Sequence, residues 1–176
     1  MLSIESCPLP ENALLNEYVR LGAYTDCFRT DLDAEVTHAA FVRAFYTTPL
    51  FKLERLILTW LLSKPSTDDE ALQLAAGTTD SFAAWQVERR CTDQLLLTDF
   101  AGRTRSWLMI EANGKAVTRL YFGSAVTTPG EPKQSNQRHG PGFSLLIGFH
   151  RVYSVLLLYS ARKRLQHKPR GSNNPS

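Results

Sequence analysis

Strand patterns between residues 81 and 127 constrain the fold of this chain more than any other feature of its sequence. Valine, threonine and aromatic residues recur there in runs that turn residues separate. Four strands fit these runs, at about 82–90, 94–100, 103–112 and 115–127. Short strands joined by turns are typical of an antiparallel meander, so the sequence predicts an antiparallel sheet.

Two turns in this region predict how the strands pair. Asn113-Gly114 is a strong two-residue hairpin signal and would place Ala112 opposite Lys115. A two-residue loop at Ala101-Gly102 would fix the pairing of the strands at 94–100 and 103–112 in the same way.

This register distributes the side chains over two partly apolar faces, with Leu95 opposite Leu108. The first face would hold Leu95, Leu97, Asp99, Ser106, Leu108, Ile110, Val117, Arg119 and Tyr121. The second face would hold Leu96, Thr98, Arg105, Trp107, Met109, Leu120 and Phe122. A sheet with one wet face is polar on that side, so we expect the N-terminal segment or another subunit to cover the second face.

Segments with helical spacing of apolar residues come before and after residues 81–127 in the sequence. A weakly alternating run at 23–32 predicts one more strand, which comes before most of the helices. The helical segments are 11–20, ended by Gly22; two helices from Thr37 onward that meet at a bend near Pro49; 66–77, ended by Gly77; and 143–166. The last helix is apolar nearly all round in its first two thirds, so we expect it to be enclosed on more than one side.

The chain of 176 residues, 43% of them apolar, is long enough for one domain with a sizeable core. Its formal net charge of +3 comes from the C-terminal end, which carries Arg162, Lys163, Arg164, Lys168 and Arg170. The rest of the chain is slightly acidic, so we expect no nucleic-acid surface. The basic end is a candidate for weak contact with an anionic membrane, and equally for an ordinary solvated helix end.

Two further features concern the compartment. The N-terminus lacks a basic region before its prolines, and His150 and Arg151 interrupt the long apolar run, so the sequence predicts neither a secretory signal nor a transmembrane segment. Cys7, Cys27 and Cys91 form no CxxC or Cys/His cluster. We therefore expect a reducing, cytoplasmic setting, with no bound metal and no cofactor. We expect Cys27 to be a small side chain of the core.

The order of elements indicates an α+β fold whose last helix lies across a curved sheet. That order, with Tyr24-Thr25-Asp26-Cys27-Phe28, the Pro49 bend and Phe149-His150-Arg151, resembles a bacterial family of unknown function. This family lies in the START/polyketide cyclase/Bet v 1-like (SRPBCC) superfamily. The resemblance implies a helix-grip domain at 22–166, after an N-terminal helical segment at 1–21 and before a disordered tail at 167–176. It also implies a curved antiparallel sheet around the C-terminal helix, with two short helices after the first strand.

The resemblance further implies a hydrophobic cavity between the sheet and the C-terminal helix, with a small apolar or amphipathic ligand. Arg119, Tyr121 and Asp99 share one predicted face and are candidates for orienting such a ligand. Arg103, Arg105 and Trp107 lie two residues apart and are candidates for holding a carboxylate or stacking on a ring. Ordinary surface roles are the alternative for both groups, and for Glu88.

His150 beside Arg151 in an apolar helix is the candidate for chemistry, because charged neighbours and burial shift pKa values there. In a cyclase or isomerase, His150 would act as general acid and base, Asp26 would orient it, and Arg151 or Arg119 would stabilise an anion. Ligand binding, with Arg151 among the contacting residues, and a purely structural ion pair are the alternatives for the same residues. A homodimeric module without ligand, joined through the second sheet face, is the third possibility, and the sequence does not decide whether the protein is an enzyme.

Overall fold

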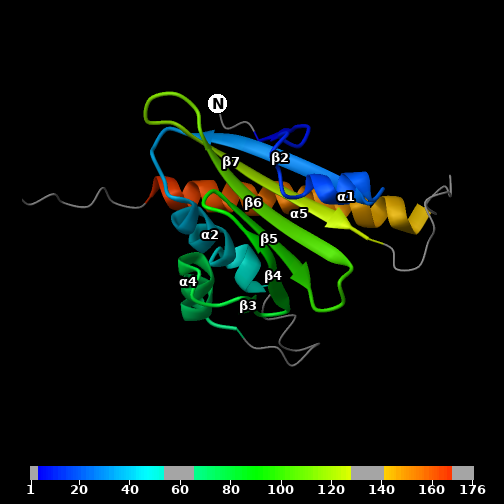
Figure 1. The fold of residues 1–176 in the computed structure, drawn as a ribbon. Coiled ribbons are helices and arrows are strands. Elements are labelled where there is room, and N and C mark those ends of the chain that lie inside the picture. The colour runs from blue at the N-terminus through cyan, green and yellow to red at the C-terminus, as the bar shows by residue number, and fades with distance from the viewer. Residues whose placement is uncertain (1–3, 54–65, 128–140, 168–176) are drawn as a thin grey trace, which may run out of the picture.

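The computed structural model describes residues 4–53, 66–127 and 141–167, with residues 141–150 described as helical backbone only. It has an α+β fold in which a curved, seven-stranded antiparallel sheet is combined with a long C-terminal helix (Figure 1). The strands lie in the order β1-β2-β7-β6-β5-β4-β3. The elements are β1 (Glu5–Ser6), α1 (Asn16–Arg20), β2 (Tyr24–Leu32), α2 (His38–Tyr46), α4 (Asp68–Ala76), β3 (Ser81–Phe82), β4 (Trp85–Arg90), β5 (Gln94–Asp99), β6 (Thr104–Ala112), β7 (Thr118–Val126) and α5 (Pro141–Gln166).

Local signals account for the boundaries of α2 and α4. The Thr37 side chain accepts a hydrogen bond from the backbone amide of Ala40 at the start of α2. Thr67 and Glu70 form a reciprocal capping box at the start of α4, and Gly77 ends that helix in the left-handed conformation. Helical backbone resumes at 49–53, and the rest of the helix expected after the Pro49 bend lies outside the described residues.

The predicted register is confirmed in one hairpin and wrong in the next. Leu95 lies opposite Leu108, as the loop at Ala101-Gly102 predicts. Ala112, however, lies opposite Thr118 and not Lys115. The connection uses residues 113–117, with positive φ at Gly114 and Ala116, so it is longer than a two-residue turn. Because the shift is an odd number of residues, it moves every side chain of β7 to the other face.

The inner face of the sheet is covered by α2, α4 and α5 and holds an aromatic core. Phe45 and Phe122 lie with ring centroids 4.7 Å apart, and Tyr46 and Phe51 with centroids 4.9 Å apart. The hydroxyl of Tyr46 pairs with that of Ser106 at 3.0 Å, so the buried phenol is satisfied. The sheet centre beneath α2 is therefore filled by side chains.

The outer face is covered by residues 7–20 of the same chain, which include α1 and are called the N-terminal segment from here on. Leu15 and Tyr18 pack in one buried cluster with Trp107 and with Leu96, Met109, Tyr121 and Ala125. Gly123 permits this close approach, because a Cβ there would lie 3.0 Å from the Trp107 ring and 3.1 Å from Leu15. The second predicted sheet face is thus covered by the N-terminal segment, which is one of the two covers expected. The same apolar face, also considered as a subunit interface, is therefore already occupied within the chain.

Helix α5 lies over β2 and β7, beside α2 (Figure 1). Leu157, Leu158 and Ala161 face the core, while Val152 is 60% and Leu156 47% exposed. Because α5 contacts α2 as well as β2 and β7, its described part is enclosed on more than one side, as expected, and Val152 and Leu156 mark the face that stays exposed. Among the described residues, no helix has both the length and the apolarity needed to cross a bilayer.

Candidate functional site

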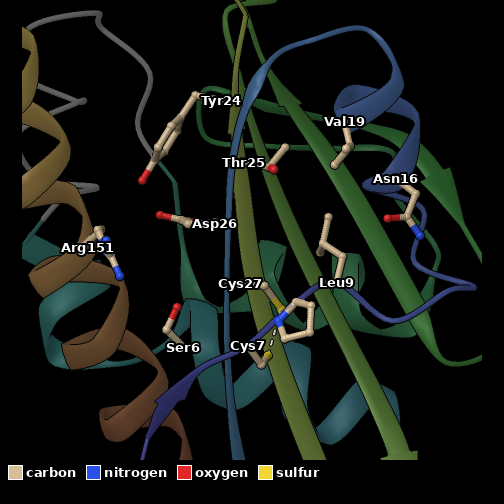
Figure 2. Close-up of a pocket in the computed structure, with 11 residues that line it drawn as sticks. Ser6, Cys7, Leu9, Asn16, Val19, Tyr24, Thr25, Asp26, Cys27 and Arg151 are labelled. Atoms are coloured by element: carbon tan, nitrogen blue, oxygen red, sulfur yellow. Dashed lines mark hydrogen bonds between the residues drawn. The ribbon is translucent and has the colours of Figure 1, made fainter.

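A groove of about 470 Å³ opens at the edge of β2, between the N-terminal segment and α5 (Figure 2). It runs around the first half of β2, so it is lined by residues from both faces of the sheet. Its lining residues are Ser6, Cys7, Pro8, Leu9, Asn16, Val19, Tyr24, Thr25, Asp26, Cys27 and Arg151.

The groove exists because β1 covers only part of the edge of β2. The two strands pair at 5–6 and 28–29, and the amide of Cys7 then donates to the carbonyl of Cys27 at 3.0 Å. Pro8 follows and has no amide hydrogen with which to continue a ladder. Backbone groups two residues apart on a strand point the same way, so those of Thr25 face the open edge.

One wall of the groove is polar. Figure 2 shows the hydroxyl of Tyr24, the carboxylate of Asp26 and the guanidinium of Arg151 directed into the space between β2 and α5. The carboxylate is held in place because its Oδ1 accepts hydrogen bonds from the hydroxyl of Ser124 at 2.6 Å and its amide at 3.1 Å. The groove therefore presents a fixed acceptor and a cation on one side.

Tyr24 adds a hydrogen-bond donor to this wall. Burial raises the pKa of its phenol above the ordinary value, the negative charge of Asp26 raises it further, and the positive charge of Arg151 partly opposes both. The phenol therefore stays protonated at neutral pH and can donate to a bound polar group.

The other wall is apolar and belongs to the N-terminal segment. Pro8 and Leu9 line it, Val19 of α1 is 49% exposed beside them, and the buried Cys27 of β2 lies next to this wall. A hollow with one polar and one apolar wall suits a molecule that itself has a polar and an apolar end.

Two of the residues singled out from the sequence, Asp26 and Arg151, line this groove together. His150 precedes Arg151 in α5, but its side chain lies outside the described residues. Sequence reasoning missed Tyr24 and the approach of Cys7 to Cys27. Two prolines directly after a short extended segment are the signal that could have indicated an incompletely covered edge.

The ligand set expected from Arg119, Tyr121 and Asp99 is wrong in its geometry, because the register of β7 puts the first two on the outer face. Arg119 forms a two-pronged ion pair with Asp31, at 2.7 and 3.0 Å. Its guanidinium holds the pKa of that carboxyl below its usual value. The hydroxyl of Tyr121 donates to Glu111 at 2.8 Å.

Asp99 lies at the end of β5, apart from that pair. Its carboxylate accepts the backbone amide of Arg103 at 2.7 Å and thereby closes the turn between β5 and β6. A turn-capping role accounts for this aspartate without a ligand.

Trp107 and Arg105 likewise have partners within the protein. Trp107 is 0% exposed, and its indole nitrogen donates to the Gln94 side chain at 2.9 Å. Arg105 donates to the hydroxyl of Tyr18 at 2.8 Å and to the carboxylate of Glu88 at 2.9 Å, with its guanidinium over the Tyr18 ring. These residues fasten α1 to the sheet, so they are not free to bind a ligand.

A second hollow, of about 580 Å³, lies between α2, α4 and the end of α5. It is larger, but it is lined mainly by alanines and by Arg43 and Arg164, without a carboxylate acceptor. Arg164 already donates to the carbonyl of Thr47 at 2.8 Å, and Arg162 donates to that of Asp31 at 2.8 Å. Two cations assigned to a possible membrane contact are thus engaged in the fold, while Lys168 and Arg170 lie outside the described residues.

Comparison with known proteins adds little to this description. No family model and no curated protein matches the chain. Among solved structures, it is similar to the crystal structure of CalU16 from Micromonospora echinospora, with 14% sequence identity and a TM-score of 0.32. The match covers 94% of this chain and 93% of that one.

Proposed function

We propose that this protein binds a small amphipathic molecule in the groove at the open edge of β2. The observation that carries the proposal is the meeting of a polar wall, Tyr24, Asp26 and Arg151, with the apolar wall around Leu9. Binding sites for small molecules are mostly apolar hollows with a few fixed polar groups, and this groove has that composition.

The polar wall would hold the ligand's polar end by complementary hydrogen bonds. Arg151 and Tyr24 supply donors and Asp26 supplies an acceptor whose orientation Ser124 fixes. An occupant with a hydroxyl, carbonyl or carboxyl group fits this arrangement. Its apolar end would cover Leu9 and Val19 and so remove exposed apolar surface from water.

We also propose that residues 22–166 form a helix-grip domain of the SRPBCC superfamily. The order of elements, the curved antiparallel sheet and the long C-terminal helix support this assignment. The groove opens at the margin between sheet and C-terminal helix, whereas aromatic side chains fill the space beneath α2. The ligand would therefore enter at this margin and not at the centre of the sheet.

Acid–base chemistry in the same groove is a second candidate. The observation that favours it is the fixed carboxylate of Asp26 beside a protonated phenol and the guanidinium of Arg151. A positioned carboxylate can accept a proton while a nearby cation stabilises the developing anion. A molecule released from the groove that is chemically altered by the wild-type protein, and not by Asp26→Asn, would establish this activity.

Native mass spectrometry of freshly purified protein tests the binding proposal. A mass adduct that is released on denaturation, and that is reduced at least about tenfold in Arg151→Glu, is the expected result, since a charge reversal removes the main donor. Lys115→Glu is the control, because Lys115 is an exposed cation in the connection between β6 and β7. Equal adducts in all three proteins would contradict a ligand in this groove.

A further inference from the structure

Cys7 and Cys27 lie together at the floor of the groove, although the sequence separates them by the whole of α1. Their sulfur atoms are 3.4 Å apart. The pairing of Glu5 with Arg29 and of Ser6 with Phe28 continues directly to this pair, and the Cys7 amide donates to the Cys27 carbonyl. Opposed residues of this kind have Cα atoms about 5.5 Å apart, which is a spacing that a disulfide can span.

We propose that Cys7 and Cys27 form a redox-active thiol pair, which a hydroperoxide converts into an intrachain disulfide. Both cysteines are free thiols in the structure. Cys27 is buried and Cys7 is half-buried, and both line the groove through which a small oxidant can reach Cys7. This role goes beyond ligand binding and does not depend on it.

The surroundings make Cys7 the reactive member of the pair. The hydrogen bond between the two sulfur atoms holds the pKa of Cys7 below its ordinary value; burial opposes this effect, and the positive charge of Arg29 reinforces it. The same hydrogen bond, together with burial, raises the pKa of Cys27. Cys7 is therefore the nucleophile, and Cys27 is the resolving thiol already in contact with it.

The reaction balances with one hydroperoxide. The Cys7 thiolate attacks a peroxide oxygen, the O–O bond breaks, and Cys7 becomes a sulfenic acid while the leaving oxygen takes up a proton. The sulfur of Cys27 then attacks the sulfur of Cys7, the S–S bond forms and the S–O bond breaks. The departing hydroxide takes the Cys27 proton and leaves as water, so two thiols are oxidised and the peroxide is reduced.

The disulfide would tie the N-terminal segment to the edge of β2. This segment covers the outer sheet face and forms the apolar wall of the groove. In the reduced protein, hydrogen bonds and packing hold this wall in place. In the oxidised protein, a covalent bond would hold it as well.

Treatment of the reduced full-length chain with hydrogen peroxide, followed by alkylation in denaturant and mass spectrometry, tests the proposal. We expect a product that carries one alkyl group, on Cys91, and has Cys7 joined to Cys27. Its mass should be that of the singly alkylated reduced chain less two hydrogen atoms. In folded protein this pairing should exceed either pairing with Cys91 at least about a hundredfold, because the thiols are already in contact. In urea the preference should fall below about tenfold, which is the advantage that the shorter loop between Cys7 and Cys27 gives an unfolded chain.

Variants distinguish the pair from general thiol oxidation. Cys91→Ser should leave the product unchanged, since Cys91 is exposed and has no part in the pair. Cys7→Ser should abolish it and leave Cys27 as a free thiol, and its circular dichroism shows whether it folds. Should Cys7→Ser fail to fold, the thermal midpoint of Cys91→Ser decides, because it should be higher after peroxide treatment and return on reduction. Oxidation of Cys91 ahead of the pair, or an unchanged midpoint, would overturn the proposal.

Discussion

The two faces of the sheet are both covered, but by different kinds of structure. The inner face carries regular helices on an aromatic core, whereas the outer face carries an irregular segment ending in the short helix α1. Inner contacts are mainly apolar, with single polar contacts such as that between Tyr46 and Ser106, while the outer cover is fastened chiefly by Gln94 and the Tyr18–Glu88–Arg105 cluster.

This difference explains where the groove lies. Helices present wide apolar stripes that fill the space against a sheet. The irregular segment is joined to the sheet by single hydrogen bonds, and its two prolines cannot donate to a strand ladder, so it leaves part of the β2 edge uncovered. The irregular cover is thus the part of the fold that leaves a sheet edge open to a ligand.

The largest effect should come from the inner core. Phe45→Ala removes a ring that contacts four other aromatic rings, and we expect a loss of about 3–5 kcal/mol in the free energy of unfolding. Urea denaturation followed by circular dichroism measures this loss. Exposed Phe100 provides the control, and Phe100→Ala should change stability by less than about 0.5 kcal/mol. Similar losses in both variants would show that the inner face is not the main core.

Gln94 should dominate the outer face. Its side chain accepts hydrogen bonds from the Leu14 amide and the Trp107 indole and donates to the Asn12 carbonyl. Gln94→Met leaves these groups unpaired beneath the segment, and we expect a loss of about 2–3 kcal/mol. Faster hydrogen exchange at the Leu14 amide is the specific signature. Gln86→Met, at an exposed position of β4, should leave both quantities unchanged.

Tyr18→Phe should have a smaller effect. It removes the hydroxyl that donates to Glu88 and accepts from Arg105 but keeps the ring that packs against the sheet. We expect a loss of about 1 kcal/mol, measured by urea denaturation. Tyr159→Phe, at a position of α5 that is 36% exposed, is the control. No loss in Tyr18→Phe would mean that packing alone holds α1.

The smallest effect should be a pH dependence at His38. Burial lowers its pKa; the Leu108 carbonyl that it contacts and the charge of Asp93 oppose this shift, and Arg90 adds to it. The unfolded chain then binds this proton first, so stability should fall as pH drops below the ordinary histidine pKa of about 6.5 and level off below the folded-state value. His38→Gln should flatten this part of the stability profile, and His167→Gln, at an exposed site, should not. An identical slope in all three proteins would contradict a half-buried, neutral His38.

Sequence reasoning succeeded where a signal is local. The end of a helix at Gly77 and the loop at Ala101-Gly102 each depend on neighbouring residues, and the structure has both. It failed at Asn113-Gly114, where the chain continues past the expected turn, and this one error misplaced Arg119 and Tyr121. Hairpin length depends on how the flanking strands pack as well as on the turn residues.

The groove was only partly predictable for a similar reason. Asp26 and Arg151 stand out as charges within apolar segments, so the sequence selects them. Their meeting with Leu9 and Cys7 depends on how the N-terminal segment crosses the sheet edge, and no periodicity encodes that path. Long-range placement of an irregular segment is set by tertiary packing, not by propensity.

A crystal structure of the protein with the molecule released from it, or with a medium-chain fatty acid if none is released, tests the central claim most directly. We expect electron density in the groove, with the polar end between Arg151 and Tyr24 and the apolar end against Leu9. Density in the hollow between α2 and α4, or an empty groove beside a ligand bound elsewhere, would contradict the account.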